Sequence, residues 1–409
     1  MQRSWKQSFY VLWVAQIIAI VGFRSVQPFL PYYIQELNVD SLAAASVWAG
    51  YLGTIHGFAM ALAAPLWGAL ADRLGRRPMV VRSMVGGGIT VLLMAYVVSV
   101  EQLLVVRFLH GVLSGSVTAS ITLVSTTTPR LHLAFALGML QTAFMFGGAL
   151  GALFGGPAID YFGYHNCFIA AGLLVVAAGL LVQTRVEEDF RPADKERTDR
   201  EKFLVGAWRI FGLPGFPILL VCLTLSHFTF GVSMPVTPLF LQELTKTKDI
   251  ASIAGPIFAL SMLVGGIASA AMGKYSDRIG ARQALVGSMV ASALFFALKG
   301  FSTSVGMMAA LMILSGLASG AMRPVTNVLV TKIVPAKDRG VAFGVITSAS
   351  ALGWGLGPAL GGYIGATWGF RAVFFITAAI FLSVALWSWG AIGRLAISDR
   401  PGQGDAALH

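Results

Sequence analysis

Long apolar segments, separated by short polar turns, follow one another along almost the whole chain. Each segment is long enough to cross a bilayer as a helix, which takes ~20 residues at a rise of ~1.5 Å per residue. Apolar windows bounded by charged or turn residues number twelve. We therefore predict an all-α membrane protein with transmembrane helices at 9–36, 46–70, 79–98, 102–127, 136–160, 166–185, 214–242, 251–273, 284–301, 303–329, 341–366 and 371–392.

The two halves of the chain resemble each other at a shift of about 206 residues. PFLPYYIQEL from Pro28 corresponds to PVTPLFLQEL from Pro235, and GALADRLGRR from Gly68 corresponds to GKYSDRIGAR from Gly273. Two further pairs, LHGVLSG with LSGLASG and GALFGG with GPALGG, follow in the same order. The repeat predicts two pseudo-symmetric six-helix bundles at 1–185 and 213–393, a linker at 186–212 and a tail at 394–409.

Composition supports an integral membrane protein. The 409 residues are 56% hydrophobic and only 11% charged, whereas a soluble domain carries roughly a quarter of its residues as charged side chains. The first apolar run is too long for a cleavable signal peptide, so we expect none. Cys167 and Cys222 are isolated within apolar runs, and we expect them to be core residues and not a disulfide or a metal site.

Charge sets the expected orientation. Most of the 29 basic residues fall in segments on the same side of the predicted helices as the N-terminus. By the positive-inside rule, both termini and the linker face the cytoplasm. The net charge of +11 is then an orientation signal, and no nucleic-acid partner is needed to explain it.

Three motifs resemble those of a known family. GALADRLGRR, between the second and third helices, resembles the signature loop of the major facilitator superfamily. Arg107-Phe-Leu-His-Gly111 resembles the helix-4 arginine motif of that superfamily. Gly22, followed by Pro28 and Pro31, is similar to the helix-1 motif of its twelve-helix drug:proton antiporter group.

One antiporter motif stands in an unusual place. GPALGG, from Gly357, resembles the glycine–proline motif of the antiporters, but it lies in helix 11. In helix 5, where the family carries the motif, Ala152 replaces the proline.

The resemblance implies a secondary transporter that works by alternating access. It implies a central cavity lined by helices 1, 4, 7 and 10, and a proton gradient as energy source without a cofactor. We expect a monomer that acts on small molecules in a bacterial inner membrane, with the lipid bilayer as its surroundings.

The resemblance also implies a gate on the cytoplasmic side. Gly68 and Gly75 would let helix ends approach closely, and Asp72 would meet the start of helix 11, since a carboxylate is stabilised at a helix N-terminus. The expected gating residues are Gly68, Asp72, Arg73, Gly75, Arg76, Asp277 and Arg278.

Basic side chains lie within the predicted cavity helices. Arg24, Arg107 and Arg323 fall inside helices 1, 4 and 10, and no acidic residue lies near the centre of a predicted span. A charge that faces lipid costs at least a few kcal/mol, so such residues mark a transport path by default. The cavity would be electropositive, and a guanidinium suits a carboxylate or phosphate on the cargo. Structural roles, such as snorkelling of Arg24 toward water, remain the alternative.

Candidate site residues follow from these positions. Basic groups of the cavity helices and nearby aromatic residues predict a substrate-binding set of Arg24, Arg107, His227, Arg323, Phe23, Tyr32, Phe144, Phe228 and Trp354. Side chains that can exchange a proton give a coupling set of His227, His110, Glu36 and Glu243.

The sequence therefore predicts a proton-coupled exporter of small amphiphilic organic molecules, anionic or zwitterionic. A polyspecific exporter of neutral or cationic drugs is an alternative, and an importer is another, because direction does not follow from sequence. A membrane-embedded lipid-modifying enzyme is disfavoured. Such chemistry needs paired carboxylates, a nucleophile with its base, or a metal cluster, and the sequence offers no spacing that suggests one.

Overall fold

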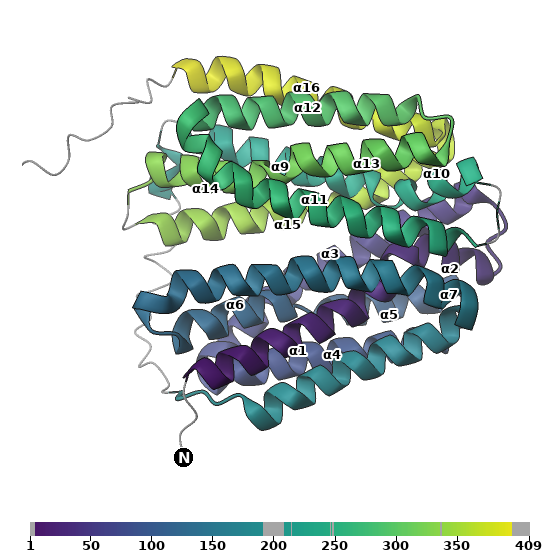
Figure 1. The fold of residues 1–409 in the computed structure, drawn as a ribbon, viewed down its shortest axis with the longest axis horizontal. Coiled ribbons are helices and arrows are strands. Elements are labelled where there is room, and N and C mark those ends of the chain that lie inside the picture. Colours follow the sequence, from purple (N-terminus) through teal and green to yellow (C-terminus); the bar gives the residue numbers. More distant parts are fainter. Residues whose placement is uncertain are drawn as a thin grey trace, which may run out of the picture.

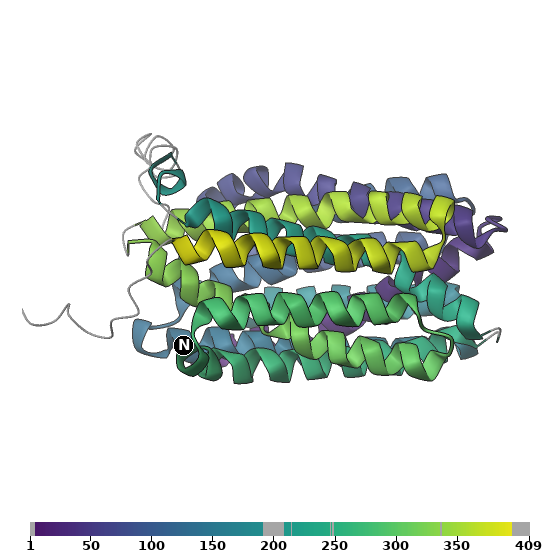
Figure 2. The ribbon, with the colours of Figure 1, turned by 90° about the horizontal axis from the view of Figure 1, so that it is seen from above.

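The computed structural model describes residues 5–190, 208–213, 215–245, 247, 249–335 and 338–394, without the side chains of residues 273, 274, 277, 323 and 392–394. This part of the chain is helical and contains no strand. Its helices run roughly parallel along the long axis of the molecule (Figure 1, Figure 2). In Figure 1 the N-terminal half forms the lower bundle and the C-terminal half forms the upper one.

The N-terminal half contains seven α-helices and two 3-10 turns. They are α1 (Trp5–Val26), η1 (Gln27–Phe29), α2 (Leu30–Glu36), α3 (Leu42–Leu74), α4 (Arg77–Met94), α5 (Val100–Leu113), α6 (Ser116–Thr127), η2 (Arg130–His132) and α7 (Leu133–Arg185).

The described part of the C-terminal half follows the same plan. Its long helices are α9 (Phe216–Ser233), α10 (Val236–Thr245), α11 (Ile250–Ile279), α12 (Ala281–Gly300), α13 (Val305–Gly320), α14 (Met322–Ile333), α15 (Arg339–Trp368) and α16 (Phe370–Arg394).

All twelve predicted spans correspond to helices in this part of the chain. Ten helical segments are long and apolar enough to cross a membrane. One of them, Arg130–Arg185, contains two predicted spans, because α7 bends at Gly163, whose φ of 79° is not helical. The remaining predicted span is α4, which carries Arg77, Arg82 and three consecutive glycines.

Each of the four expected cavity helices is interrupted. The first breaks at η1, between α1 and α2, and the fourth breaks at Gly115, whose φ is +110°. The seventh breaks between α9 and α10, and the tenth breaks between α13 and α14. Interrupted helices expose backbone polar groups, which a bilayer tolerates only where they are buried in protein or line a cavity. The breaks therefore indicate a functional centre along these helices.

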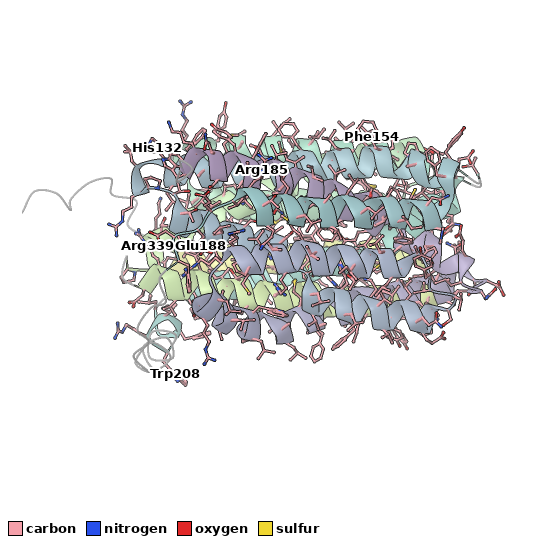
Figure 3. All side chains as sticks on the ribbon, turned by 90° about the horizontal axis from the view of Figure 1, so that it is seen from below. His132, Phe154, Arg185, Glu188, Trp208 and Arg339 are labelled. Atoms are coloured by element: carbon pink, nitrogen blue, oxygen red, sulfur yellow. The ribbon has the colours of Figure 1, made fainter. Side chains whose placement is uncertain are left out.

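One end of the molecule carries clustered basic side chains, and we call it the basic end. Arg185 and Arg339 lie toward it together with His132, Glu188 and Trp208 (Figure 3). Helices α2 and α10 lie at the opposite end (Figure 1). The predicted orientation places the basic end in the cytoplasm.

Hydrogen bonds between the halves lie toward the opposite end wherever both partners are described. Two hydrogen bonds join the side-chain amides of Gln35 and Gln242, at 2.9 and 3.0 Å. The hydroxyl of Tyr32 donates to the carbonyl of Pro238 at 2.9 Å. The remaining interhalf bonds are Ser46 Oγ to the Gly362 carbonyl, Ala359 N to Thr54 Oγ1, and Ser252 N to Asp160 Oδ2. We call these contacts the seal.

Helices α3 and α15 pack closely near the seal. In α3, a β-carbon at Gly53 would fall 2.8 Å from Cβ of Pro358, so α3 and α15 nearly touch there. Further along, no atom lies within 4 Å of the corresponding position at Gly68, nor at Gly340 at the start of α15. The described hydrogen bonds between the halves are therefore concentrated at the seal, away from the basic end.

Candidate functional site

A cavity of about 340 Å³ lies between the two halves, behind the seal. This volume falls in the range of sites for small organic ligands. Both halves contribute to its wall, through α1, α3, α5 and α7 on one side and α9, α11, α13 and α15 on the other. Five prolines, which mark the breaks and kinks of these helices, also line it: Pro28, Pro31, Pro235, Pro238 and Pro358.

Arg24 enters the cavity wall from the last turn of α1. Small residues of α7 let α1 approach closely, since a β-carbon at Gly151 would fall 2.8 Å from Cβ of Arg24. The side chain is partly exposed and forms no hydrogen bond or ion pair with another described residue. Its guanidinium is therefore available to a ligand in the cavity.

Arg107 supplies a second positive charge from α5. Its side chain is only 4% exposed and lines the cavity. Its Nε has no hydrogen-bond partner in the described part of the chain. A buried guanidinium nitrogen without a partner costs free energy that a bound acceptor would recover.

Acidic side chains are absent from the described residues of the cavity wall. Asp160 lies in the seal, where it accepts from Ser252 N at 2.6 Å. Glu36, the last residue of α2, and Glu243, in the last turn of α10, are exposed and do not line the cavity. The cavity is therefore electropositive, and an anionic group would complement it.

Two histidines stack behind Arg107. The rings of His56, from α3, and His110, from α5, are 5.1 Å apart and inclined by 28°. His110 Nδ1 lies 2.7 Å from Thr90 Oγ1, and the Thr90 hydroxyl donates to the Gly87 carbonyl at 2.8 Å. Because this hydroxyl proton is already used, we assign the proton to His110 Nδ1, which leaves Nε2 as the basic nitrogen.

The wall from the C-terminal half is apolar. Its six large side chains are three aromatic rings and three thioethers, from Phe230, Phe258, Trp354, Met234, Met262 and Met312. Thr237 and Ser261 are the hydroxyl groups among the described residues of this wall. Among the described lining residues, the charged side chains thus come from the N-terminal half, and the aromatic rings and thioethers come from the C-terminal half.

The structure brings three predicted substrate-binding residues into the cavity wall. These are Arg24, Arg107 and Trp354. The side chain of Arg323, in α14, lies outside the described residues. The other predicted side chains that are described lie elsewhere.

Packing explains where those five lie. Phe23 and Phe144 pack within the N-terminal bundle, and Phe23 contacts the His110 ring edge-on at 5.4 Å between centroids. Tyr32 is buried in the seal. His227 and Phe228 lie on the side of α9 that packs against α15, where a β-carbon at Gly353 would fall 2.9 Å from Phe228 N.

Predicted coupling residues differ in position. His110 is buried in the stacked pair, and Nδ1 of His227 lies 2.8 Å from the Leu223 carbonyl on its own helix. Glu36 and Glu243 are exposed at the end opposite the basic end. Of these residues, His110 is in the immediate neighbourhood of a charged cavity residue, since Arg107 lies one turn earlier on α5.

Most of the predicted gating residues form the turn between α3 and α4. Asp72 and Arg73 lie in the last turn of α3, Gly75 ends it with a φ of 97°, and Arg76 precedes α4. Arg278 is exposed in the last turn of α11. The side chain of Asp277 lies outside the described residues. The expected contact of Asp72 with helix 11 stays a prediction.

Glu188, which the sequence did not single out, binds this turn. Its carboxylate accepts from Arg76 N at 2.9 Å and from Arg77 N at 2.7 Å, at the N-terminus of α4. A β-carbon at Gly75 would fall 2.9 Å from Glu188 Oε2, so glycine leaves room for this contact. The start of the linker is therefore tied to the gating turn.

Sequence reasoning also missed most of the apolar wall. Phe258 and Met262 come from α11, which was not expected to line the cavity. Nothing in the sequence distinguishes their side chains from others in apolar runs, whereas Arg24 and Arg107 were found because a charge in such a run is rare.

The chain is similar to proteins of known class. The sequence pattern of the Major Facilitator Superfamily matches residues 12–244 and 219–405. Multidrug resistance protein MdtG of Salmonella arizonae is 31% identical over 393 residues, which cover 96% of each chain. MdtG of Citrobacter koseri is 32% identical over the same length and coverage.

Solved structures share the fold. A bacterial homolog of the human lysosomal transporter Spinster, inward-facing and unoccupied, superposes with a TM-score of 0.80 at 16% identity, covering 98% of this chain and 99% of that one. The human organic anion transporter MFSD10 (TETRAN) gives 0.67 at 19% identity, with 95% and 100% covered. The nucleoside transporter NupG gives 0.78 at 17% identity, with 94% and 99% covered. Together with the duplicated bundles and the shared cavity, the match over the whole chain shows that this protein belongs to the Major Facilitator Superfamily.

Proposed function

We propose that this multi-pass inner-membrane transporter exports small amphiphilic organic molecules that carry negative charge, as anions or zwitterions, in exchange for protons. One observation carries the choice of cargo. Arg24 and Arg107 face the cavity, and no acidic side chain among the described residues lines it. A cargo carboxylate, sulfonate or phosphate would give these guanidinium groups the partner that the protein does not provide.

Relatives support the direction of transport. The proteins that share about a third of this sequence are named multidrug resistance proteins, which are efflux transporters. The structural relatives include an organic anion transporter and a nucleoside transporter, and at 17–19% identity they support the fold alone.

The closed seal corresponds to the loading state of the proposed export cycle. With the basic end in the cytoplasm, this state admits cargo from the cytoplasm and blocks its path outward. Rocking of the halves would break the seal and close the basic end, which is the alternating-access step expected of two equivalent bundles.

Proton exchange is the second part of the proposal. The stacked histidines, His56 and His110, are the imidazole groups next to Arg107, and we assign the exchanged proton to this pair. Arg107 lies between this pair and the cargo. Because like charges repel, a proton on the histidine pair is disfavoured by the charge of Arg107. Binding of an anionic cargo group at Arg107 and protonation of the pair therefore influence each other.

Transport by purified protein in liposomes tests the cargo assignment. We expect Arg24→Gln to lower uptake of an anionic dye into inside-out vesicles by about 10- to 100-fold, since hydrogen bonds to charged groups contribute about 1.5–3 kcal/mol. Arg24→Lys keeps the charge and should retain part of the activity. Uptake of the anionic dye at the wild-type rate by Arg24→Gln would refute the assignment.

A polyspecific exporter of cationic or neutral drugs is the second candidate. Trp354, which is 41% exposed and lines the cavity, is the observation that favours it, because an indole ring attracts cations. In the same vesicles this candidate predicts that cationic dyes are transported and that Arg24→Gln leaves their transport intact or increases it.

A further inference from the structure

The apolar wall is a preformed surface and not only packing between helices. Behind it, the Phe230 ring lies 5.5 Å from that of Phe381 and 6.0 Å from that of Phe296, so rings of α12 and α16 hold it in place. The carbonyl of Met312 accepts hydrogen bonds from the hydroxyls of Ser261 and Ser315, each at 2.9 Å. The bond from Ser261 fixes α13 against α11. A wall supported in this way loses little conformational entropy when a ligand binds.

The apolar wall of the C-terminal half and the Arg24 side chain of the N-terminal half meet at Gly148 in α7. A β-carbon at this glycine would fall 3.3 Å from Sδ of Met262 and 3.9 Å from Cγ of Arg24. The thioether from one half and the guanidinium stem from the other therefore flank the same point. A single small ligand can reach both.

We propose that Phe230, Phe258, Met262 and Met312 form a separate subsite for the hydrocarbon or aromatic body of the cargo, whose charged group lies at Arg24 and Arg107. The charged end of this arrangement rests on the proposed function. The cargo then lies across the boundary between the halves, with its head on the N-terminal half and its body on the C-terminal half.

Thioethers and aromatic rings suit such a subsite. They are polarisable, and methionine adapts to apolar groups of different shape, so one wall accepts many bodies. Selection then depends on the head group, while the body adds affinity in proportion to the apolar area that it buries. This division explains how a cavity with fixed charges can serve several cargoes.

A homologous series of ligands tests the subsite. Binding of hexyl, heptyl and octyl sulfonate to the full-length protein in nanodiscs is measured by calorimetry, and partition into protein-free nanodiscs is subtracted. For the wild type we expect affinity to rise by about fourfold per methylene group, which corresponds to ~0.8 kcal/mol. Arg24→Gln should weaken all three ligands by the same factor and leave the increment unchanged.

Variants of the wall should change the increment itself. Met262→Gln and Met312→Gln, of nearly unchanged volume, should reduce it to less than twofold per methylene, while Met262→Leu should keep it. Met307→Gln is the matched control, because Met307 lies on the same helix as Met312 and does not line the cavity. Thermal unfolding of each variant in detergent checks that it is folded.

The two assignments fail in different ways. An unchanged increment in both glutamine variants, with weakened binding in Arg24→Gln, would refute the subsite and leave the anionic cargo in place. A reduced increment together with wild-type affinity in Arg24→Gln would support the subsite and refute the anionic head group.

Discussion

At the residue scale, the position of a charge is decisive at the start of α4, where Glu188 binds two backbone N–H groups. Phe230, and not Phe228, lines the cavity, because residues two positions apart on a helix point about 200° apart and the packing of α9 against α15 determines which side faces the cavity.

Glu188 gives a prediction at this scale. Its carboxylate binds two backbone N–H groups at the start of α4, so Glu188→Ala should lower the free energy of unfolding by about 1 to 2 kcal/mol, as for loss of a helix cap. Thermal unfolding of the purified protein measures the change. Asp189→Ala, which alters an exposed neighbouring acid, is the control. Equal stability of the two variants would show that the Glu188 contact contributes nothing.

At the element scale, the duplication predicted more than the spans. The repeated QEL segments place Gln35 and Gln242 at equivalent positions of the two halves, and the structure shows these amides bonded to each other. The sequence therefore indicated that the two glutamines are equivalent, but it did not indicate that they contact each other. The breaks in the cavity helices were not predicted, because the apolar runs continue across them, although Pro28 and Pro235 mark two of the breaks.

The glutamine pair should control the seal. Gln35→Ala removes both hydrogen bonds of the pair. Because each neutral hydrogen bond contributes about 1 kcal/mol, the loss should raise the ratio of seal-open to seal-closed molecules by about 30-fold. Distances between spin labels on α2 and α10 report this ratio. Gln242→Ala should have the same effect, and the double variant should add little, since one pair is lost in each case.

Gln102→Ala is the control for the seal experiment. Gln102 lies at the start of α5, and its amide oxygen accepts from Val98 N within one half. Additive effects of the two seal variants, or an equal shift in Gln102→Ala, would contradict a role of the Gln35–Gln242 pair in closure.

At the scale of the whole molecule, the two halves have the same fold but different roles at the cavity. Among the described lining residues, the N-terminal half brings the charges, and the C-terminal half brings the aromatic rings and thioethers. A ligand that contacts both halves interacts differently with the two states of the cycle, which is the condition for cargo to influence their populations.

The most direct measurement compares three ligands that share an octyl chain and differ in head group: a sulfonate, a sulfobetaine and a trimethylammonium. Their affinities for the wild type and for Arg24→Gln are determined by calorimetry in nanodiscs. The electropositive cavity predicts that the sulfonate binds most tightly and the ammonium least. Arg24→Gln should lower the ratio of sulfonate affinity to ammonium affinity by about 10-fold or more. Tightest binding of the ammonium ligand, with no change in Arg24→Gln, would contradict the account.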